Sequence, residues 1–196
     1  VNIDLPGYTP KLEASSEEIN EAAKLINNSK KPVIIAGHGA LISHAHNEVI
    51  ELAEKCQIPV ITTLLGISTL PTNHFLNLGM PGMHGMAYAS IAIEESDTLI
   101  ALGMRFDDRV TGKLEAFAPN ARVLHVDIDP SEIGKNIKPH VGIQGDLKTV
   151  LKQLIPAVNT TVNAEWMARI EQLRTEHPSL NIRETSDLLP QYVLKE

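Results

Sequence analysis

Glycines, charged side chains and hydroxyls follow several short apolar runs of this 196-residue chain. The segments concerned are Gly37-His38-Gly39, Thr63-Leu64-Leu65, Gly103 to Arg109, Asp127-Ile128-Asp129 and Gly145-Asp146. Glycine lets a ligand approach the backbone, arginine binds diphosphates through two parallel contacts, and aspartate accepts hydrogen bonds from hydroxyls. If the apolar runs are parallel strands, their carboxyl ends meet at the edge of the sheet where ligands bind. The pattern therefore predicts a nucleotide crevice.

Two segments carry the densest chemistry, and each has a structural alternative. Residues 79–85 (GMPGMHG) form either a cofactor-lining loop or a loop whose methionines cap the core. Residues 105–109 (RFDDR) suit either diphosphate binding or a self-paired charge cluster, and their place directly after an apolar run favours binding. At the end of the fourth run we expect Asp127 to bind a hydroxyl and Asp129 to cap the following turn.

The remaining reactive groups indicate binding more than catalysis. The dinucleotide fingerprint GxGxxG fails because Ile42 stands where its third glycine belongs, which disfavours a standard NAD domain. The sequence has no motif for a serine nucleophile, a P-loop or a zinc protease. We interpret Cys56 as a buried thiol and His125 as a core histidine, whereas His44 and His46 lack a partner at zinc-ligand spacing.

The elements that must position these residues can be read from the apolar pattern. Five runs rich in Val, Ile and Leu are typical of strands covered on both faces: 32–37, 58–63, 98–103, 122–127 and the shorter 141–144. Helical spacing follows Ser15, which has capping-box spacing to Glu18, and recurs after a possible cap at Ser43 and after Asp146. A further helix carries Trp166. We predict a three-layer α/β/α fold, a Rossmann-like variant with a mostly parallel sheet of about five or six strands.

Composition narrows the function classes. A formal net charge of −7 supplies no basic field for nucleic acid or for an anionic membrane surface. No apolar run approaches the roughly 18 residues of a membrane span. The single cysteine permits no internal disulfide, which fits a reducing compartment. We expect a cytoplasmic protein that binds neither nucleic acid nor membrane.

Four motifs resemble, in order and spacing, the central domain of acetolactate synthase (acetohydroxyacid synthase) large subunits. They are GMPGMHG (79–85), ALGMRFDDRVTGKLEAFAP (101–119), HVDIDPSEIGKN (125–136) and QGDL (144–147). The resemblance implies an enzyme of branched-chain amino-acid biosynthesis that uses thiamine diphosphate and Mg²⁺. Such an enzyme decarboxylates pyruvate and joins the two-carbon unit to a second 2-ketoacid. The resemblance also implies that this central domain binds FAD, with a mainly structural role, and that the compartment is the plastid if the source is a plant or alga.

The resemblance further implies which residues contact FAD, and these come from the five strand ends and the GMHG loop. They are Gly37, His38, Gly39, Thr63, Leu64, Leu65, Gly82, Met83, His84, Gly103, Met104, Arg105, Asp107, Arg109, Val110, Asp127, Ile128, Gly145, Asp146 and Leu147. Two positions depart from the family. After the first strand the family commonly has Gly-Gly-Gly, whereas this chain has Gly37-His38-Gly39. After the second strand the family usually has Gly-Leu-Gly, whereas this chain has Gly66-Ile67-Ser68. We therefore expect the His38 side chain to point away from the cofactor, or FAD to lie slightly differently.

The sequence contains neither the thiamine diphosphate motif nor the catalytic glutamate motif of the family, so we expect a non-catalytic domain of a longer enzyme. Residues 1–14 would then be a linker from a preceding domain, 15–157 the FAD-binding domain, and 158–196 a helix and linker toward a thiamine diphosphate domain. The implied partners are these flanking domains, a second copy in a homodimer or tetramer, and a regulatory small subunit. The alternatives are the middle domain of a glyoxylate carboligase or pyruvate oxidase, and a stand-alone nucleotide-binding module.

Overall fold

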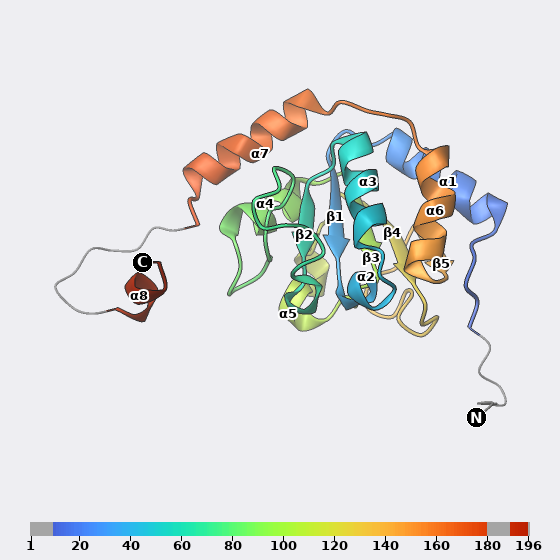
Figure 1. Ribbon diagram of the computed structural model, residues 1–196, viewed down its shortest axis with the longest axis horizontal. Coiled ribbons are helices and arrows are strands. Elements are labelled where there is room, and N and C mark those ends of the chain that lie inside the picture. The colour runs from blue at the N-terminus through green and yellow to red at the C-terminus, as the bar shows by residue number, and fades with distance from the viewer. Residues whose placement is uncertain (1–9, 180–188, 196) are drawn as a thin grey trace.

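The computed structural model describes residues 10–179 and 189–195, and within them a five-stranded parallel sheet forms the centre of the fold (Figure 1). The strands are β1 (Pro32–Ala36), β2 (Val60–Thr62), β3 (Thr98–Leu102), β4 (Arg122–Asp127) and β5 (Val141–Gln144). Their spatial order is β2-β1-β3-β4-β5, and all four neighbouring pairs are parallel. This order is that of a doubly wound, Rossmann-like sheet, which confirms the predicted fold class. Parts of the predicted connecting segments 1–14 and 158–196, namely 1–9, 180–188 and 196, lie outside the described residues.

The strand register brings the predicted site segments to the same level. Ala36 of β1 pairs with Thr62 of β2 and with Leu102 of β3, and Leu102 pairs in turn with Val126 of β4. The residues that follow these positions, among them Gly37 and Gly103, therefore emerge side by side at the carboxyl edge of the sheet. In Figure 1 this edge lies at the lower end of β1, next to α2 and α5.

Helices cover both faces of the sheet and account for the unbroken apolar strands. One face packs against α1 (Ser16–Asn27), α3 (His46–Cys56) and α6 (Leu147–Ala157), and the other against α4 (Ala87–Glu95) and α7 (Ala164–Glu176). Alternate residues of β1 divide between the two cores, with Ile34 in the first and Ile35 in the second. The shorter elements are α2 (His38–Ile42), η1 (Leu64–Gly66), α5 (Asp108–Thr111), η2 (Leu114–Ala116) and α8 (Pro190–Lys195).

Two of the three predicted helix caps are confirmed. Ser15 Oγ accepts a hydrogen bond from the Glu18 N–H while the Glu18 carboxylate accepts one from the Ser15 N–H, which completes a capping box. Asp146 Oδ1 accepts a hydrogen bond from the Thr149 N–H at the start of α6. The cap predicted at Ser43 is wrong, because the chain first forms α2 and Ser43 closes that helix by donating to the Gly39 carbonyl. The N-cap residue of α3 is Ala45, whose side chain accepts no hydrogen bond.

Sequence periodicity missed α2 and α4. The α4 sequence AYASIAIEE is apolar or small nearly all round, so no stripe marks a buried face. The predicted helix around Trp166 is confirmed as α7, where the Trp166 indole donates to the Pro32 carbonyl at 3.0 Å and Arg169 pairs with Glu95 of α4 at 2.7 Å. In the described part of the chain, no helix combines the length and apolar character needed to cross a membrane.

Candidate functional site

The strand order places a topological switch between β1 and β3. From β1 the chain crosses to β2 on one side, whereas β3, β4 and β5 follow in order on the other side. Where the loops after two adjacent strands run in opposite directions, a crevice opens at the carboxyl edge of the sheet. Ligands of doubly wound sheets bind in this crevice. The predicted residues after β1 and β3 flank this switch point.

Glycines lock the two loops of the switch point together. The Gly37 N–H donates to the Leu102 carbonyl and the Gly39 N–H donates to the Gly103 carbonyl, each at 2.9 Å. A Cβ atom on Gly37 would overlap the Gly103 carbonyl oxygen, and one on Gly39 would lie 2.7 Å from the Gly103 Cα. These glycines are therefore required for the close contact between the two backbones, a role that the sequence pattern did not reveal. His38, between them, is exposed, which explains why a large side chain is tolerated at this position.

The GMPGMHG loop packs against the loop that follows β3. Its Gly82 has a φ of +93°, and a Cβ atom there would lie 2.8 Å from the Arg109 carbonyl oxygen. The Gly82 N–H donates to Ser90 Oγ of α4 at 3.1 Å. Met83 is 91% exposed and His84 is also exposed, so core capping does not describe the tip of this loop. Both side chains are available to a ligand.

The RFDDR segment is a self-paired charge cluster that keeps its cations in solvent. Arg105 Nη2 lies 3.2 Å from Asp107 Oδ2, and Arg109 Nε lies 3.9 Å from Asp108 Oδ1. The Arg105 and Arg109 side chains are 64% and 86% exposed. Exposed ion pairs of this kind contribute at most about 1 kcal/mol, so an anionic ligand can replace the aspartate partners at low cost. The geometry is compatible with both sequence interpretations.

The end of β4 presents two carboxylates in different roles. Asp129 Oδ1 accepts hydrogen bonds from the N–H and the hydroxyl of Ser131, and these bonds lower the pKa of Asp129, which confirms its predicted capping role. Asp127 is half-buried and accepts one hydrogen bond from the Asp129 N–H at 3.0 Å. Burial raises the pKa of Asp127. The Gly145 N–H donates to the Asp127 carbonyl at 3.0 Å and so brings the end of β5 beside it.

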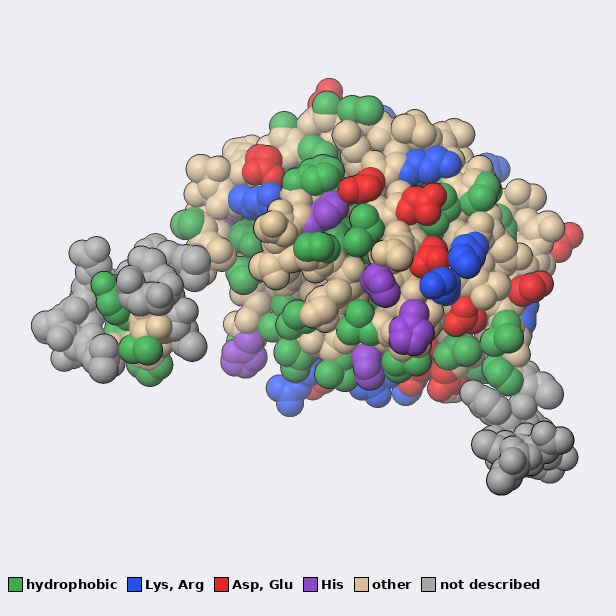
Figure 2. All heavy atoms as spheres, viewed as in Figure 1, with side chains coloured by type: hydrophobic (Ala, Val, Ile, Leu, Met, Phe, Trp, Pro, Cys, Tyr) green, Lys and Arg blue, Asp and Glu red, His purple; other side chains and the backbone are tan. Residues whose placement is uncertain are grey.

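The remaining predicted residues divide by exposure. Leu64 and Leu65, at 67% and 61% exposure, present apolar side chains at this edge, and Thr63, Val110 and Ile128 are at least partly exposed. Met104 and Leu147 are buried in the two cores, so only their backbone could meet a ligand. The Asp146 carboxylate already caps α6. Along the lower edge of Figure 2, hydrophobic, histidine, basic and acidic side chains lie next to one another.

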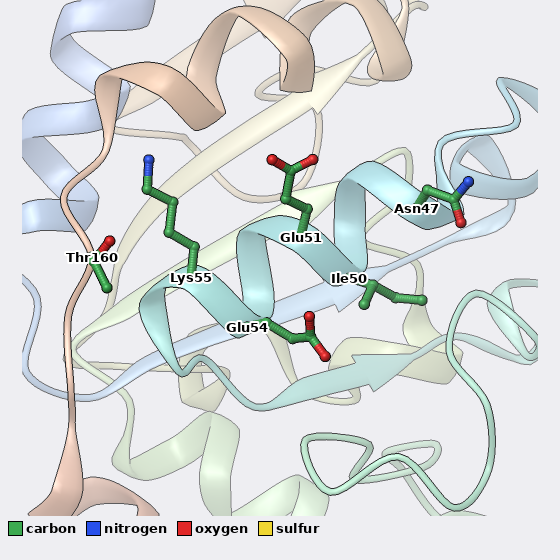
Figure 3. Close-up of a pocket in the computed structure, with 6 residues that line it drawn as sticks. All are labelled: Asn47, Ile50, Glu51, Glu54, Lys55 and Thr160. Atoms are coloured by element: carbon green, nitrogen blue, oxygen red, sulfur yellow. The ribbon is translucent and has the colours of Figure 1, made fainter.

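A hollow of about 520 Å³ lies elsewhere, along the outside of α3. Its lining contains none of the predicted site residues and consists of Asn47, Ile50, Glu51, Glu54, Lys55 and Thr160 (Figure 3). Two of its charged groups already have partners, because Lys55 Nζ donates to the Ile155 carbonyl and Glu54 lies 3.2 Å from His74. This hollow is broad and solvent-facing, and the strand ends remain the better candidate site.

Sequence reasoning missed the residues that support the site from behind. Ser90 holds the GMPGMHG loop, and the Asn136 side chain donates to the Phe106 carbonyl at 2.6 Å. His125 is buried as predicted, and its imidazole also reaches the Met104 carbonyl at 2.9 Å. Their partners are backbone atoms of distant loops, and the sequence carries no local signal for such contacts.

Comparison with known proteins identifies the family. A family model described as "Thiamine pyrophosphate enzyme, central domain" matches residues 19–154. The chain is 46% identical over 201 aligned residues to "Acetolactate synthase" of Mycobacterium bovis, which covers 99% of the chain and 32% of that protein. It is 49% identical over 175 residues to "Probable acetolactate synthase large subunit" of Methanocaldococcus jannaschii, covering 88% of the chain and 30% of that protein.

A third relative, "Acetolactate synthase large subunit" of Corynebacterium glutamicum, is 44% identical across 98% of the chain. The chain thus spans about a third of the length of the relatives that it matches. Both the fold and the positions of the four motifs agree with this match. The chain belongs to the central-domain family of thiamine pyrophosphate enzymes, in the form found in acetolactate synthase large subunits.

Proposed function

We propose that this domain binds FAD at the carboxyl edge of its sheet, within an acetolactate synthase. The observation that carries the proposal is that three kinds of side chain lie together around one switch point. They are exposed guanidinium groups, a half-buried carboxylate and exposed apolar side chains. All of them lie near the carboxyl ends of the strands, which the register places side by side. A flavin nucleotide combines a diphosphate, ribose hydroxyls and flat apolar rings, so its parts match these groups in kind.

The roles follow from the chemistry of each group. Arg105 and Arg109 would hold the diphosphate, because both are exposed cations beside the switch point. Asp127 would accept a hydrogen bond from a ribose hydroxyl. Leu64 and Met83 would cover apolar ring surface that is otherwise in contact with water. When bound, the flavin would supply mainly structural support to the catalytic domains.

For the full-length protein we propose the reaction of its relatives' family, the decarboxylation of pyruvate and its condensation with a second 2-ketoacid. Thiamine diphosphate and Mg²⁺ would be held by flanking domains. In the described part of the chain, no group of three His, Cys, Asp or Glu side chains could hold a metal ion. We further propose a homodimer or tetramer, a regulatory small subunit as partner, and a cytoplasmic compartment, or a plastid in an alga. The names of the relatives support the assignment to the enzyme, and 15–157 remains the proposed extent of the FAD domain.

The test uses the full-length enzyme and its flavin absorbance after gel filtration. Arg105→Ala and Asp127→Ala should each reduce the FAD retained per subunit. Arg122→Ala is the matched control, because Arg122 is also exposed but begins β4 at the opposite edge of the sheet. Flavin absorbance that is unchanged in both site variants, or reduced equally in the control, would contradict the assignment.

A further inference from the structure

The loop from Met104 to Arg109 is held from behind by two side chains. His125 of β4 is fully buried, and its Nε2 lies 2.9 Å from the Met104 carbonyl oxygen. Asn136 donates from Nδ2 to the Phe106 carbonyl at 2.6 Å. The Phe106 ring also meets the His125 ring edge to face, with centroids 5.1 Å apart. The two residues that flank Arg105 are thus fixed through their carbonyl groups.

The hydrogen bond defines the protonation state of His125. A carbonyl oxygen can only accept, so His125 Nε2 must carry the proton and donate it. The other ring nitrogen, Nδ1, is buried and has no hydrogen-bond partner among the described residues. A proton there would create a buried charge and an unpaired donor, both of which are costly. His125 is therefore the neutral Nε2–H tautomer, and burial lowers its pKa in agreement with this assignment.

The loop needs such support because its own charges provide little. The Arg105–Asp107 pair is exposed and spans 3.2 Å, so solvent screening leaves it too weak to fix the backbone. A buried hydrogen bond to a carbonyl is more effective, because breaking it leaves an unsatisfied polar group in the core. The orientation of the Met104 and Phe106 peptide groups then determines where the Arg105 side chain begins.

We propose that His125 and Asn136 are positioning residues that hold the Met104–Phe106 backbone so that Arg105 and Asp107 are preorganised for the flavin nucleotide. This inference rests on the proposed FAD site. It assigns a positioning role to one buried polar residue of β4 and to one residue outside the strand ends. Neither side chain needs to touch the cofactor.

The test measures the dissociation constant of FAD in the full-length enzyme, together with the melting temperature of each variant. His125→Gln retains an N–H donor at a position similar to that of Nε2, whereas His125→Phe fills the space without a donor. Val123→Ala is the matched control, because Val123 lies on the same strand and is also buried, but is two residues further from the loop. Asn136→Ala tests the second anchor at an exposed residue, where replacement does not threaten folding.

We expect His125→Phe to weaken FAD binding by about tenfold, the effect of losing one buried hydrogen bond. Asn136→Ala should weaken it by about fivefold, because the Asn136 hydrogen bond is only partly buried. His125→Gln should remain within about threefold of wild type, and Val123→Ala should lower the melting temperature without changing the dissociation constant. Wild-type affinity in Asn136→Ala and in a folded His125→Phe would overturn the inference, as would equal loss in Val123→Ala. If the wild-type enzyme binds no FAD, the proposed function itself fails, and this outcome is distinct from the others.

Discussion

Replacing Gly37 by alanine tests the contact between the two loops of the switch point. The added methyl group would overlap the Gly103 carbonyl oxygen and lie 2.5 Å from Met104 Cβ and 2.6 Å from Met104 Cα. Two of these three atoms belong to the backbone and the third is fixed to it, so no change of rotamer can relieve the clash. The loops after β1 and β3 must move apart, which strains the 2.9 Å hydrogen bond from Gly37 to Leu102.

The size of the effect follows from the cost of overpacking a buried site. Extra methyl groups in packed regions cost about 1–3 kcal/mol, and a clash with backbone belongs at the upper end of this range. For a chain of this length, each kcal/mol lowers the melting temperature by about 2–4 °C. We therefore expect Gly37→Ala to reduce the free energy of unfolding by about 3 kcal/mol and the melting temperature by about 6–12 °C.

The single tryptophan provides the assay. Trp166 is 2% exposed and bonds to Pro32 at the start of β1, so its fluorescence reports separation of α7 from the sheet. Unfolding in urea would be followed by this signal and by circular dichroism. The control is His38→Ala, one residue further along, which should change the free energy of unfolding by less than about 0.5 kcal/mol because His38 is exposed. A loss below about 0.5 kcal/mol in Gly37→Ala, or equal losses in both variants, would refute the steric argument.

Three further predictions concern single residues. Ser68 has a φ of +83°, which L residues rarely adopt, so Ser68→Gly should raise the free energy of unfolding by about 0.5–1 kcal/mol in urea titration, and a decrease would contradict this account. Asp146→Ala removes the cap of α6 and should lower the free energy of unfolding by about 1–2 kcal/mol in the same assay. Asp146→Asn should retain most of the capping stabilisation, because its side-chain oxygen can still accept the hydrogen bond. Burial lowers the pKa of His125 below that of the unfolded chain, although the hydrogen bond to Met104 and the charges of Asp127 and Glu132 partly oppose this shift. As pH falls below about 6.5, the unfolded chain then takes up the proton first, so stability declines with a slope of up to about 1.4 kcal/mol per pH unit. Unfolding of wild type and His125→Gln between pH 7 and pH 5 measures this slope, and the pH argument does not hold if the two proteins show the same dependence.

The strands and the four longest helices, α1, α3, α6 and α7, could be predicted because burial leaves a direct pattern in the sequence. Strands covered on both faces read as unbroken apolar runs, and α1 and α6 each pair an apolar stripe with a side-chain cap. The α4 helix was missed because its apolar residues form no stripe. The α2 helix was missed because only five residues separate Gly37 from Ser43, too few for a periodicity to show.

Strand order explains why the site could be predicted only in outline. The sequence indicated that glycine, charge or a hydroxyl follows each strand, but it does not record which strands are neighbours. Only the register shows that Gly37 and Gly103 meet, and that their missing side chains make room for backbone. The contact from His125 to Met104 is invisible for the same reason, since 21 residues separate the two partners.

The apolar side chains at the carboxyl edge give a physical reason for a ligand there. Single exposed hydrophobic residues are ordinary on protein surfaces. Here Leu64, Leu65 and Met83 are each more than 60% exposed at the same edge as the solvent-exposed guanidinium groups of Arg105 and Arg109. Covering one large apolar side chain contributes about 1.5–3 kcal/mol, so an apolar ring that also carries phosphate would be stabilised at both of its ends. A purely apolar partner would leave the guanidinium groups unmatched, and a free phosphate would leave the leucines in water, so this combination favours an amphipathic anion such as a flavin nucleotide.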